Sequence, residues 1–185
     1  MAGPMYLVAT DLDGSLLDHD SYSCGPARPM LEQLEMLRIP VVFVSSKTRN
    51  EIVALRGELD NEHPFIVENG AAVLIPAGYF AGMPDGCVER DGYWVRDFAP
   101  PRSAWRALLD DLRLRFPDAF QDFFTAGIDG IVAMTGLSRQ AAALANEREY
   151  SEPVQWRGAD RDLDAFLAAV EDGGARASRG GRFIS

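Results

Sequence analysis

Apolar and polar positions in the first half of the chain follow an α/β pattern, with short apolar runs separated by amphipathic stretches. Runs at Met5–Thr10, Ile39–Val44 and Phe65–Val67 predict three strands. The first run shows no strict alternation, which favours a strand buried on both faces. Amphipathic spacing predicts helices at Pro26–Leu37 and Arg49–Leu59. A right-handed crossover through the first helix would make the first two strands parallel.

The second half of the chain mixes strand-like and helical patterns in a less regular order. Strands are expected at Tyr93–Val95 and Val154–Trp156, and a hairpin is expected around Arg179-Gly180. The aromatic stretch Phe120–Phe124 has two interpretations, a buried segment or part of an exposed surface. Three stretches with one apolar face predict helices, namely Ser103–Phe116, Arg139–Ala145 and Asp160–Glu171.

The length of the chain allows one sizeable core or two small ones, because 47% of its 185 residues are hydrophobic. The stretch Ala77–Asp91 is rich in Gly and Pro, which is typical of a connection between domains. We therefore expect two domains, at residues 1–85 and 86–185.

The net charge of −10 and the pI near 4.6 argue against nucleic acid or an anionic membrane as a partner. Cys24 and Cys87 lie far apart, so they suggest neither a disulfide framework nor a metal site. The N-terminus lacks a signal-peptide pattern, and no apolar run approaches the length of a membrane span. We expect a soluble, cytoplasmic protein, while the sequence gives no indication of its oligomeric state.

Acidic residues stand directly after the first predicted strand. Asp11 and Asp13 would lie beyond its carboxyl end, where ligands of parallel sheets bind, and Gly14 permits a tight turn there. One carboxylate can attack phosphorus as a nucleophile, and a second can exchange protons with the leaving oxygen and with water. Mg²⁺ suits such an oxygen-rich site with a phosphorylated substrate. The alternative is that both aspartates only cap the following turn.

Polar residues also follow the second predicted strand. Ser45 can donate a hydrogen bond to a phosphate oxygen, and Lys47 can supply positive charge. Thr48 and Glu51 have the spacing of a capping box, so we interpret Thr48 as a helix cap without a binding role. The start of a helix after a strand is a natural site for an anion.

The string Asp-Leu-Asp-Gly-Ser-Leu-Leu-Asp at residues 11–18 resembles the first motif of the haloacid dehalogenase-like (HAD) phosphatases. In that family the first aspartate is the nucleophile, and the second is the general acid and base and offers its carbonyl to Mg²⁺. The resemblance implies these roles, including Mg²⁺ binding, for Asp11 and Asp13. The string Ser-Ser-Lys-Thr-Arg-Asn-Glu-Ile at residues 45–52 is similar to one subfamily, the mannosyl-3-phosphoglycerate phosphatases.

The Glu-Asn-Gly string formed by Glu68, Asn69 and Gly70 has two interpretations that the sequence leaves open. Asn69-Gly70 is a common hairpin-turn signal. The same string resembles a stretch that faces the substrate in related HAD phosphatases with a C2B-type cap.

Three arginines lie in stretches that resemble the cap of the mannosyl-3-phosphoglycerate phosphatases. Arg148 opens an Arg-Glu-Tyr-Ser-Glu-Pro string, and Arg179 and Arg182 belong to an Arg-Gly-Gly-Arg-Phe string. Together they could hold a glycerate carboxylate or a phosphate by bidentate pairing, although each alone could equally be a surface charge.

The resemblance as a whole implies an α/β fold, with a Rossmann-like HAD core around a parallel sheet and an α/β cap of the C2B type. It implies a Mg²⁺-dependent phosphatase that converts mannosyl-3-phosphoglycerate to mannosylglycerate. In the family the chain returns from the cap to the core and brings a lysine and an acidic metal loop. No such segment follows Ser185, so we expect an incomplete sheet with an uncovered edge, weak Mg²⁺ binding and slow turnover or none. The alternatives are another C2B-capped sugar-phosphate phosphatase and a sugar-phosphate binder without catalytic activity.

Overall fold

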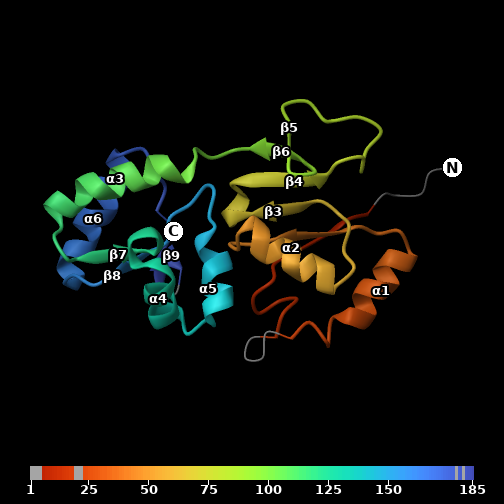
Figure 1. Ribbon diagram of the computed structural model, residues 1–185, viewed down its shortest axis with the longest axis horizontal. Helices are drawn as coiled ribbons and strands as arrows, with labels where there is room; N and C mark the ends of the chain where they lie inside the picture. Colours follow the sequence, from red (N-terminus) through yellow and green to blue (C-terminus); the bar gives the residue numbers. More distant parts are fainter. Residues whose placement is uncertain (1–5, 19–22, 178, 181) are drawn as a thin grey trace. The chain divides into compact units, whose positions relative to one another are not determined.

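The computed structural model describes residues 6–18, 23–177, 179–180 and 182–185 (Figure 1). The chain forms two compact units, Met1–Ala99 and Pro100–Ser185. Each unit contains its own sheet. The α/β class expected from the sequence is confirmed. Within the described residues, none of the helices has the length and apolar character needed to cross a membrane.

The first unit is built on a six-stranded sheet in the order β1-β2-β3-β4-β6-β5. The strands are β1 (Val8–Thr10), β2 (Val41–Val44), β3 (Phe65–Val67), β4 (Ala72–Pro76), β5 (Val88–Arg90) and β6 (Tyr93–Asp97). β1, β2 and β3 are parallel, as the crossover through α1 (Arg28–Met36) predicts, and the other pairs are antiparallel. Helix α2 (Arg49–Glu58) connects β2 to β3, and the short 3₁₀ turn η1 (Glu68–Gly70) connects β3 to β4.

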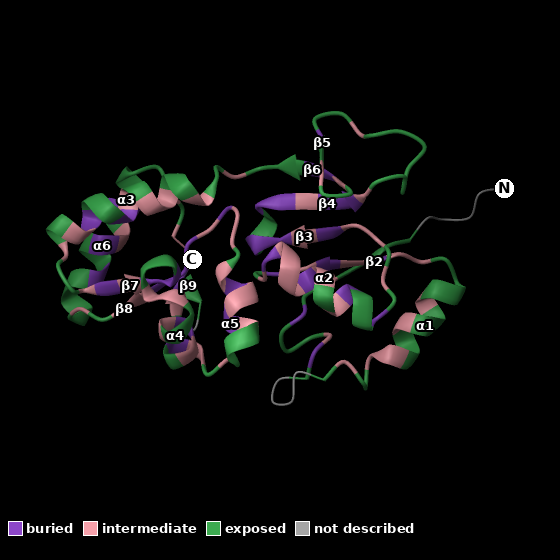
Figure 2. Cartoon of the chain, viewed as in Figure 1, coloured by how far each residue is buried: buried purple, intermediate pink, exposed green. Residues whose placement is uncertain are grey.

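The core of the first unit lies on the middle of this sheet (Figure 2). Phe43 of β2, Phe65 of β3 and Ile52 of α2 are fully buried, and β2 and β3 each have a neighbouring strand on both sides. The prediction that the first strand is buried on both faces is wrong. Among the described residues β1 pairs only with β2, at the edge of the sheet, and Leu7 and Val8 are exposed.

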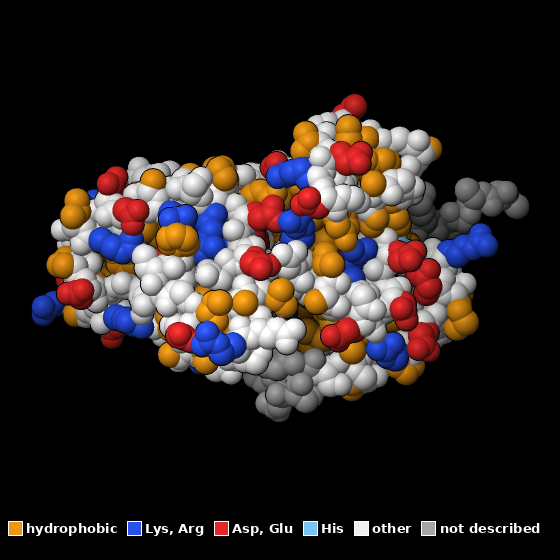
Figure 3. Space-filling model, in the orientation of Figure 1, with side chains coloured by type: hydrophobic (Ala, Val, Ile, Leu, Met, Phe, Trp, Pro, Cys, Tyr) orange, Lys and Arg blue, Asp and Glu red, His pale blue; other side chains and the backbone are white. Residues whose placement is uncertain are grey.

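Helix α1 also leaves apolar side chains exposed. All of its nine residues are described and none is buried. Figure 3 shows apolar and acidic side chains side by side over this helix, whose exposed apolar residues are Met30 and Met36. Both β1 and α1 thus leave apolar side chains exposed within the described residues.

The second unit has a four-stranded antiparallel sheet in the order β7-β8-β10-β9. The strands are β7 (Phe120–Asp122), β8 (Val154–Trp156), β9 (Arg179–Gly180) and β10 (Phe183–Ile184). The helices are α3 (Arg102–Arg115), α4 (Phe123–Thr135), α5 (Arg139–Asn146) and α6 (Asp160–Asp172). Phe166 of α6 is fully buried, and its ring packs against those of Phe116, Phe120 and Trp156.

Three details differ from the sequence-based expectations. The compact units divide after Ala99 instead of after residue 85, because β5 and β6 pair with each other and with β4. Ala77–Asp91 is therefore part of the first unit and does not connect the two. Arg179-Gly180 forms strand β9 instead of a turn, because Gly180 pairs with Phe183.

Helix α4 was not predicted at all. Gly127 interrupts it with a non-helical conformation (φ +62°), and Gly130 lies one turn further on. Two glycines and several β-branched residues hide the helical period in this stretch. The aromatic stretch before it is divided, since Phe120–Asp122 is strand β7 and Phe123 begins the helix.

Candidate active site

The acidic residues of the sequence pattern emerge at the carboxyl end of β1, beside the carboxyl end of β2. Thr10 pairs with Phe43 in register, so the two strands end at the same edge of the sheet. The side chain of Lys47 reaches across this edge, and its Nζ lies 2.9 Å from Oδ1 of Asp13. Their side chains are 20% and 43% exposed, so such a pair contributes at most about 1 kcal/mol to stability. Its main consequence is to place a positive charge beside a carboxylate.

Burial alternates along the three residues that follow β1. Leu12 is fully buried, whereas Asp11 and Asp13 are exposed. The turn closes through the amide of Leu17, which donates to the carbonyl of Leu12 at 2.8 Å, and Gly14 supplies the left-handed residue that it requires (φ +70°). The buried leucine therefore anchors a turn that presents two carboxylates.

The carboxylate of Asp11 is partly fixed by its own backbone. Its Oδ1 accepts the amide hydrogen of Leu12 at 2.7 Å. The hydroxyl of Thr10 donates to the Asp11 carbonyl at 2.8 Å. A carboxylate that is held by one oxygen and exposed to solvent can approach a substrate phosphorus with the other.

Ser45 is buried at the end of β2, where its backbone extends the parallel pairing. Its amide donates to the carbonyl of Ile66 at 3.1 Å. Its Oγ accepts the amide hydrogen of Lys47 at 3.2 Å, and a hydroxyl that accepts in this way still has a proton to donate. Ser45 and Lys47 thus come together at the position where the sequence predicted an anion site.

Thr48 and Glu51 form the predicted capping box of α2. The side chain of Thr48 accepts the amide hydrogen of Glu51 at 3.2 Å, and Oε2 of Glu51 accepts that of Thr48 at 2.8 Å. Thr48 is fully buried. These contacts support the interpretation of Thr48 as a helix cap that fixes the direction in which the Lys47 backbone leaves the strand.

Residues Glu68, Asn69 and Gly70 bring the end of β3 to the same edge. The amide of Glu68 donates to the Lys47 carbonyl at 3.1 Å, and the amide of Asn69 donates to the Ser45 carbonyl at 3.0 Å. The three residues have φ angles of +46°, +60° and +92°, and Glu68 is buried. Of the three, Glu68 is the residue for which this left-handed conformation is costly, and such backbone strain is common at functional sites.

The same residues also form a turn, because β3 and β4 pair antiparallel on either side of them. The hairpin interpretation of Asn69-Gly70 is therefore confirmed. Whether Glu68 and Asn69 contact a substrate stays a prediction, now with the added observation that their amides hold the Ser45–Lys47 backbone.

The three arginines of the predicted cap contact different elements of the second unit. Nε of Arg148 donates to Oγ of Ser151 at 2.9 Å, in the segment between α5 and β8. Arg182 donates to the carbonyl of Met134 in α4, at 3.5 Å. Arg179 lies exposed in β9. Their joint role in binding a substrate therefore stays a prediction.

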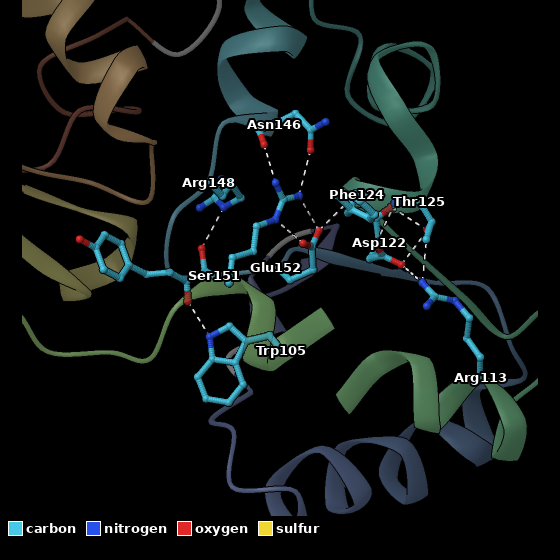
Figure 4. A network of polar contacts seen from close by, with 11 residues as sticks. Trp105, Arg113, Asp122, Phe124, Thr125, Asn146, Arg148, Ser151 and Glu152 are labelled. Atoms are coloured by element: carbon cyan, nitrogen blue, oxygen red, sulfur yellow. Dashed lines mark hydrogen bonds and ion pairs between the residues drawn. The ribbon is translucent and has the colours of Figure 1, made fainter. Parts of the chain in front are cut away.

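The sequence did not single out a buried ion pair that lies next to the predicted Arg148. Arg102 of α3 pairs with Glu152, which is almost completely buried (Figure 4). One sequence feature could have indicated this pair. Glu152 stands directly before Pro153 and strand β8, and a carboxylate buried there would need a charged partner.

The residues at this edge of the sheet supply some of the oxygen ligands that a Mg²⁺ ion needs. Asp11 and Asp13 offer exposed carboxylate oxygens, and Mg²⁺ is usually held by one or two carboxylates together with substrate phosphate. Across residues 6–18, 23–177, 179–180 and 182–185, no group of three or more His, Cys, Asp or Glu could hold a metal ion.

The chain is similar to phosphatases that act on glycosylated phosphoglycerates. It is 34% identical over 178 residues to the glucosyl-3-phosphoglycerate/mannosyl-3-phosphoglycerate phosphatase of Methanococcoides burtonii, covering 96% of this chain and 65% of that protein. It is 33% identical over 180 residues to the mannosyl-3-phosphoglycerate phosphatase of Pyrococcus horikoshii, covering 97% of this chain and 70% of that protein. The chain thus spans about two thirds of the length of these relatives.

A solved structure shares the fold. A phosphatase of the HAD superfamily from Bacteroides thetaiotaomicron superposes with a TM-score of 0.62 at 14% identity, covering 97% of this chain and 65% of that one. No protein-family model matches the chain.

Proposed function

Since the chain belongs to the HAD phosphatase family that includes the mannosyl-3-phosphoglycerate phosphatases, we propose that it hydrolyses the phosphate ester of a glycosylated 3-phosphoglycerate. The products are the free glycosylglycerate and inorganic phosphate. The names of the relatives support a mannosyl or a glucosyl substrate, and the Ser-Ser-Lys-Thr-Arg-Asn-Glu-Ile string at residues 45–52 favours the mannosyl compound.

The observation that carries this proposal is the group formed by Asp11, Asp13 and Lys47 at one edge of the sheet. Two carboxylates two residues apart, with Lys47 Nζ 2.9 Å from Asp13 Oδ1, combine a nucleophile, a proton carrier and a positive charge. Phosphoryl transfer depends chiefly on positioning and on electrostatic stabilisation of the transferred group. A role in phosphate ester hydrolysis therefore explains this group better than the alternative, in which the aspartates only cap the turn.

In the proposed reaction, an oxygen of Asp11 attacks phosphorus, and the bond from phosphorus to the glycerate oxygen breaks. Asp13 gives its proton to the leaving oxygen. Water then attacks the aspartyl phosphate and passes a proton to Asp13, and the bond from phosphorus to Asp11 breaks. Lys47 and the Ser45 hydroxyl attract the negative phosphate oxygens throughout.

Mg²⁺ would bind to the Asp11 carboxylate and the Asp13 backbone carbonyl, where it would neutralise charge on the phosphate. In the second unit, Arg148, Arg179 and Arg182 would take the glycerate carboxylate, the anionic group that the reaction leaves unchanged. Glu68, Asn69 and Gly70 would border the phosphate site through the backbone of Ser45 and Lys47.

The test is phosphate release from mannosyl-3-phosphoglycerate and glucosyl-3-phosphoglycerate with and without Mg²⁺. We expect Mg²⁺-dependent release that Asp11→Asn abolishes, because an amide cannot act as the nucleophile. Asp60→Asn is the matched control, since Asp60 is an exposed aspartate at the opposite end of the sheet, after α2. Release that survives Asp11→Asn would remove Asp11 from the mechanism. Binding of the substrate without any release would indicate a sugar-phosphate binder instead.

A further inference from the structure

The segment between α5 and β8 has no helix or strand of its own, yet α3 holds it at several points (Figure 4). The backbone amide of Arg102 donates to the carbonyl of Glu149 at 2.7 Å. The indole nitrogen of Trp105 donates to the carbonyl of Tyr150 at 2.6 Å. Both donors lie in the first turn of α3, so the segment follows the position of that turn.

The guanidinium group of Arg102 joins the two ends of the segment. Its NH1 donates to the carbonyl of Asn146 at 2.6 Å, and its NH2 donates to Oδ1 of Asn146 at 2.9 Å. The same group makes a two-pronged contact with Glu152, in which NH2 donates to Oε1 at 3.0 Å and Nε donates to Oε2. One side chain thus sets the distance between residue 146 and residue 152.

Glu152 in turn ties the segment to α4. Its Oε1 also accepts the amide hydrogen of Phe124, in the first turn of that helix, at 3.0 Å. The side chain of Glu152 is 1% exposed and that of Arg102 is 13% exposed. Removal of either partner would leave a buried charge without compensation, so the pair has no easy alternative arrangement.

Arg148 lies between the two fixed ends, and Ser151 within the same segment contacts its Nε at 2.9 Å. We propose that Arg102 and Glu152 are positioning residues that hold the 146–152 segment so that Arg148 meets the substrate's glycerate carboxylate. This inference rests on the proposed function. In this inference, part of the selectivity for phosphate esters that carry a carboxylate comes from a buried ion pair. The pair itself does not touch the substrate.

Arg113 offers a matched control on the same helix. It pairs with Asp122, which is also almost fully buried, and its guanidinium group joins α3 to β7 through Asp122 and to the first turn of α4 through Thr125. Arg102→Lys and Arg113→Lys each keep the positive charge and lose the planar fork. Both should lower the melting temperature, whereas only the first should disturb the segment that carries Arg148.

The decisive measurement is the dissociation constant of two ligands by calorimetry. One is mannosyl-3-phosphoglycerate, and the other is glycerol phosphate, which lacks the carboxylate. Mg²⁺ is left out so that turnover during the titration is limited. We expect Arg102→Lys to weaken binding of the first ligand about tenfold and that of the second less than about twofold, because a misplaced binding group loses its contact. Glu152→Gln should behave in the same way. Arg113→Lys should leave both constants within about twofold of those of the unaltered chain.

Hydrogen exchange supplies a second readout that needs no ligand. Amides of residues 147–151 should exchange faster in Arg102→Lys than in Arg113→Lys at equal distance below each variant's melting temperature. Equal exchange in the two variants, or equal weakening of both ligands by Arg102→Lys, would overturn the positioning role. Failure of the unaltered chain both to release phosphate and to bind mannosyl-3-phosphoglycerate would refute the proposed function, while faster exchange in Arg102→Lys would still show that the pair holds the segment.

Discussion

Asn69 allows a sharp test of the strained turn at the end of β3. Its φ of +60° lies in the left-handed region, and its side chain is exposed. A left-handed conformation costs about 1–2 kcal/mol for a residue with a Cβ, and little for Asn or Gly. Alanine, in contrast, loses less conformational entropy on folding than glycine does, by about 0.4–1 kcal/mol. We therefore expect Asn69→Ala to be less stable than Asn69→Gly by about 1 kcal/mol.

The assay is thermal unfolding followed by circular dichroism, with urea unfolding as a second method. For a unit of this size, about 1 kcal/mol corresponds to a shift of about 4–8 °C in melting temperature. The control is Ala54→Gly, at an exposed position inside α2, where glycine should cost about 1 kcal/mol because helices disfavour it. The order of stability of alanine and glycine should therefore be opposite at the two sites.

An Asn69→Ala variant that is as stable as Asn69→Gly, or more stable, would refute the reasoning. Comparison of Asn69→Ala with Asn69→Gly also distinguishes a role of the Asn69 side chain from a role of the backbone, because both variants lack the amide side chain. A loss of phosphate release common to both would come from the side chain. A loss confined to Asn69→Ala would come from the backbone that holds Ser45 and Lys47.

Three further predictions follow from contacts described above. Thr48→Ala should lower the free energy of unfolding by about 1 kcal/mol through loss of the helix cap, while Thr48→Ser should retain most of it, as urea unfolding will show. Phe166→Ala should cost about 3–5 kcal/mol in the same assay. Leu114→Ala, at an 86% exposed position, should change stability by less than about 0.5 kcal/mol, and a similar cost at both sites would contradict the described core. Asp13→Ala should slow phosphate release by about 10²–10⁴-fold at saturating substrate, whereas an unchanged rate would exclude Asp13 as the proton carrier.

The sequence predicted those features that depend on neighbouring residues. The acidic residues after β1, the polar residues after β2 and the capping box of α2 all follow from short-range patterns, and each lies where it was expected. The strain at Glu68 could not be predicted in this way. A buried glutamate in the left-handed region is held there by its backbone contact to Lys47, which is distant in sequence.

Features that depend on distant partners escaped the sequence-based predictions. Arg102 and Glu152 are 50 positions apart, and neither residue type is unusual where it stands. The exposure of β1 depends on its place at the edge of the sheet, which its own apolar composition does not reveal. Helix α4 was missed because Gly127 breaks its period, although Asp122 caps its start by accepting the amide hydrogen of Thr125.

The sheet of the first unit also has a consequence for the order in which the chain folds. β3, β4, β6 and β5 form the antiparallel part of the sheet, and all four lie within residues 65–97. β1 and β2, in contrast, are joined across 30 residues, from residue 11 to residue 40. Because pairing between distant segments costs more loop entropy and forms more slowly, we expect the antiparallel part of the sheet to form first and β1 to join last. Pulse-labelled exchange during refolding should then protect the amides of β6 before those of β1. A refolding chain would therefore form most of its sheet before Asp11 and Asp13 reach their final positions.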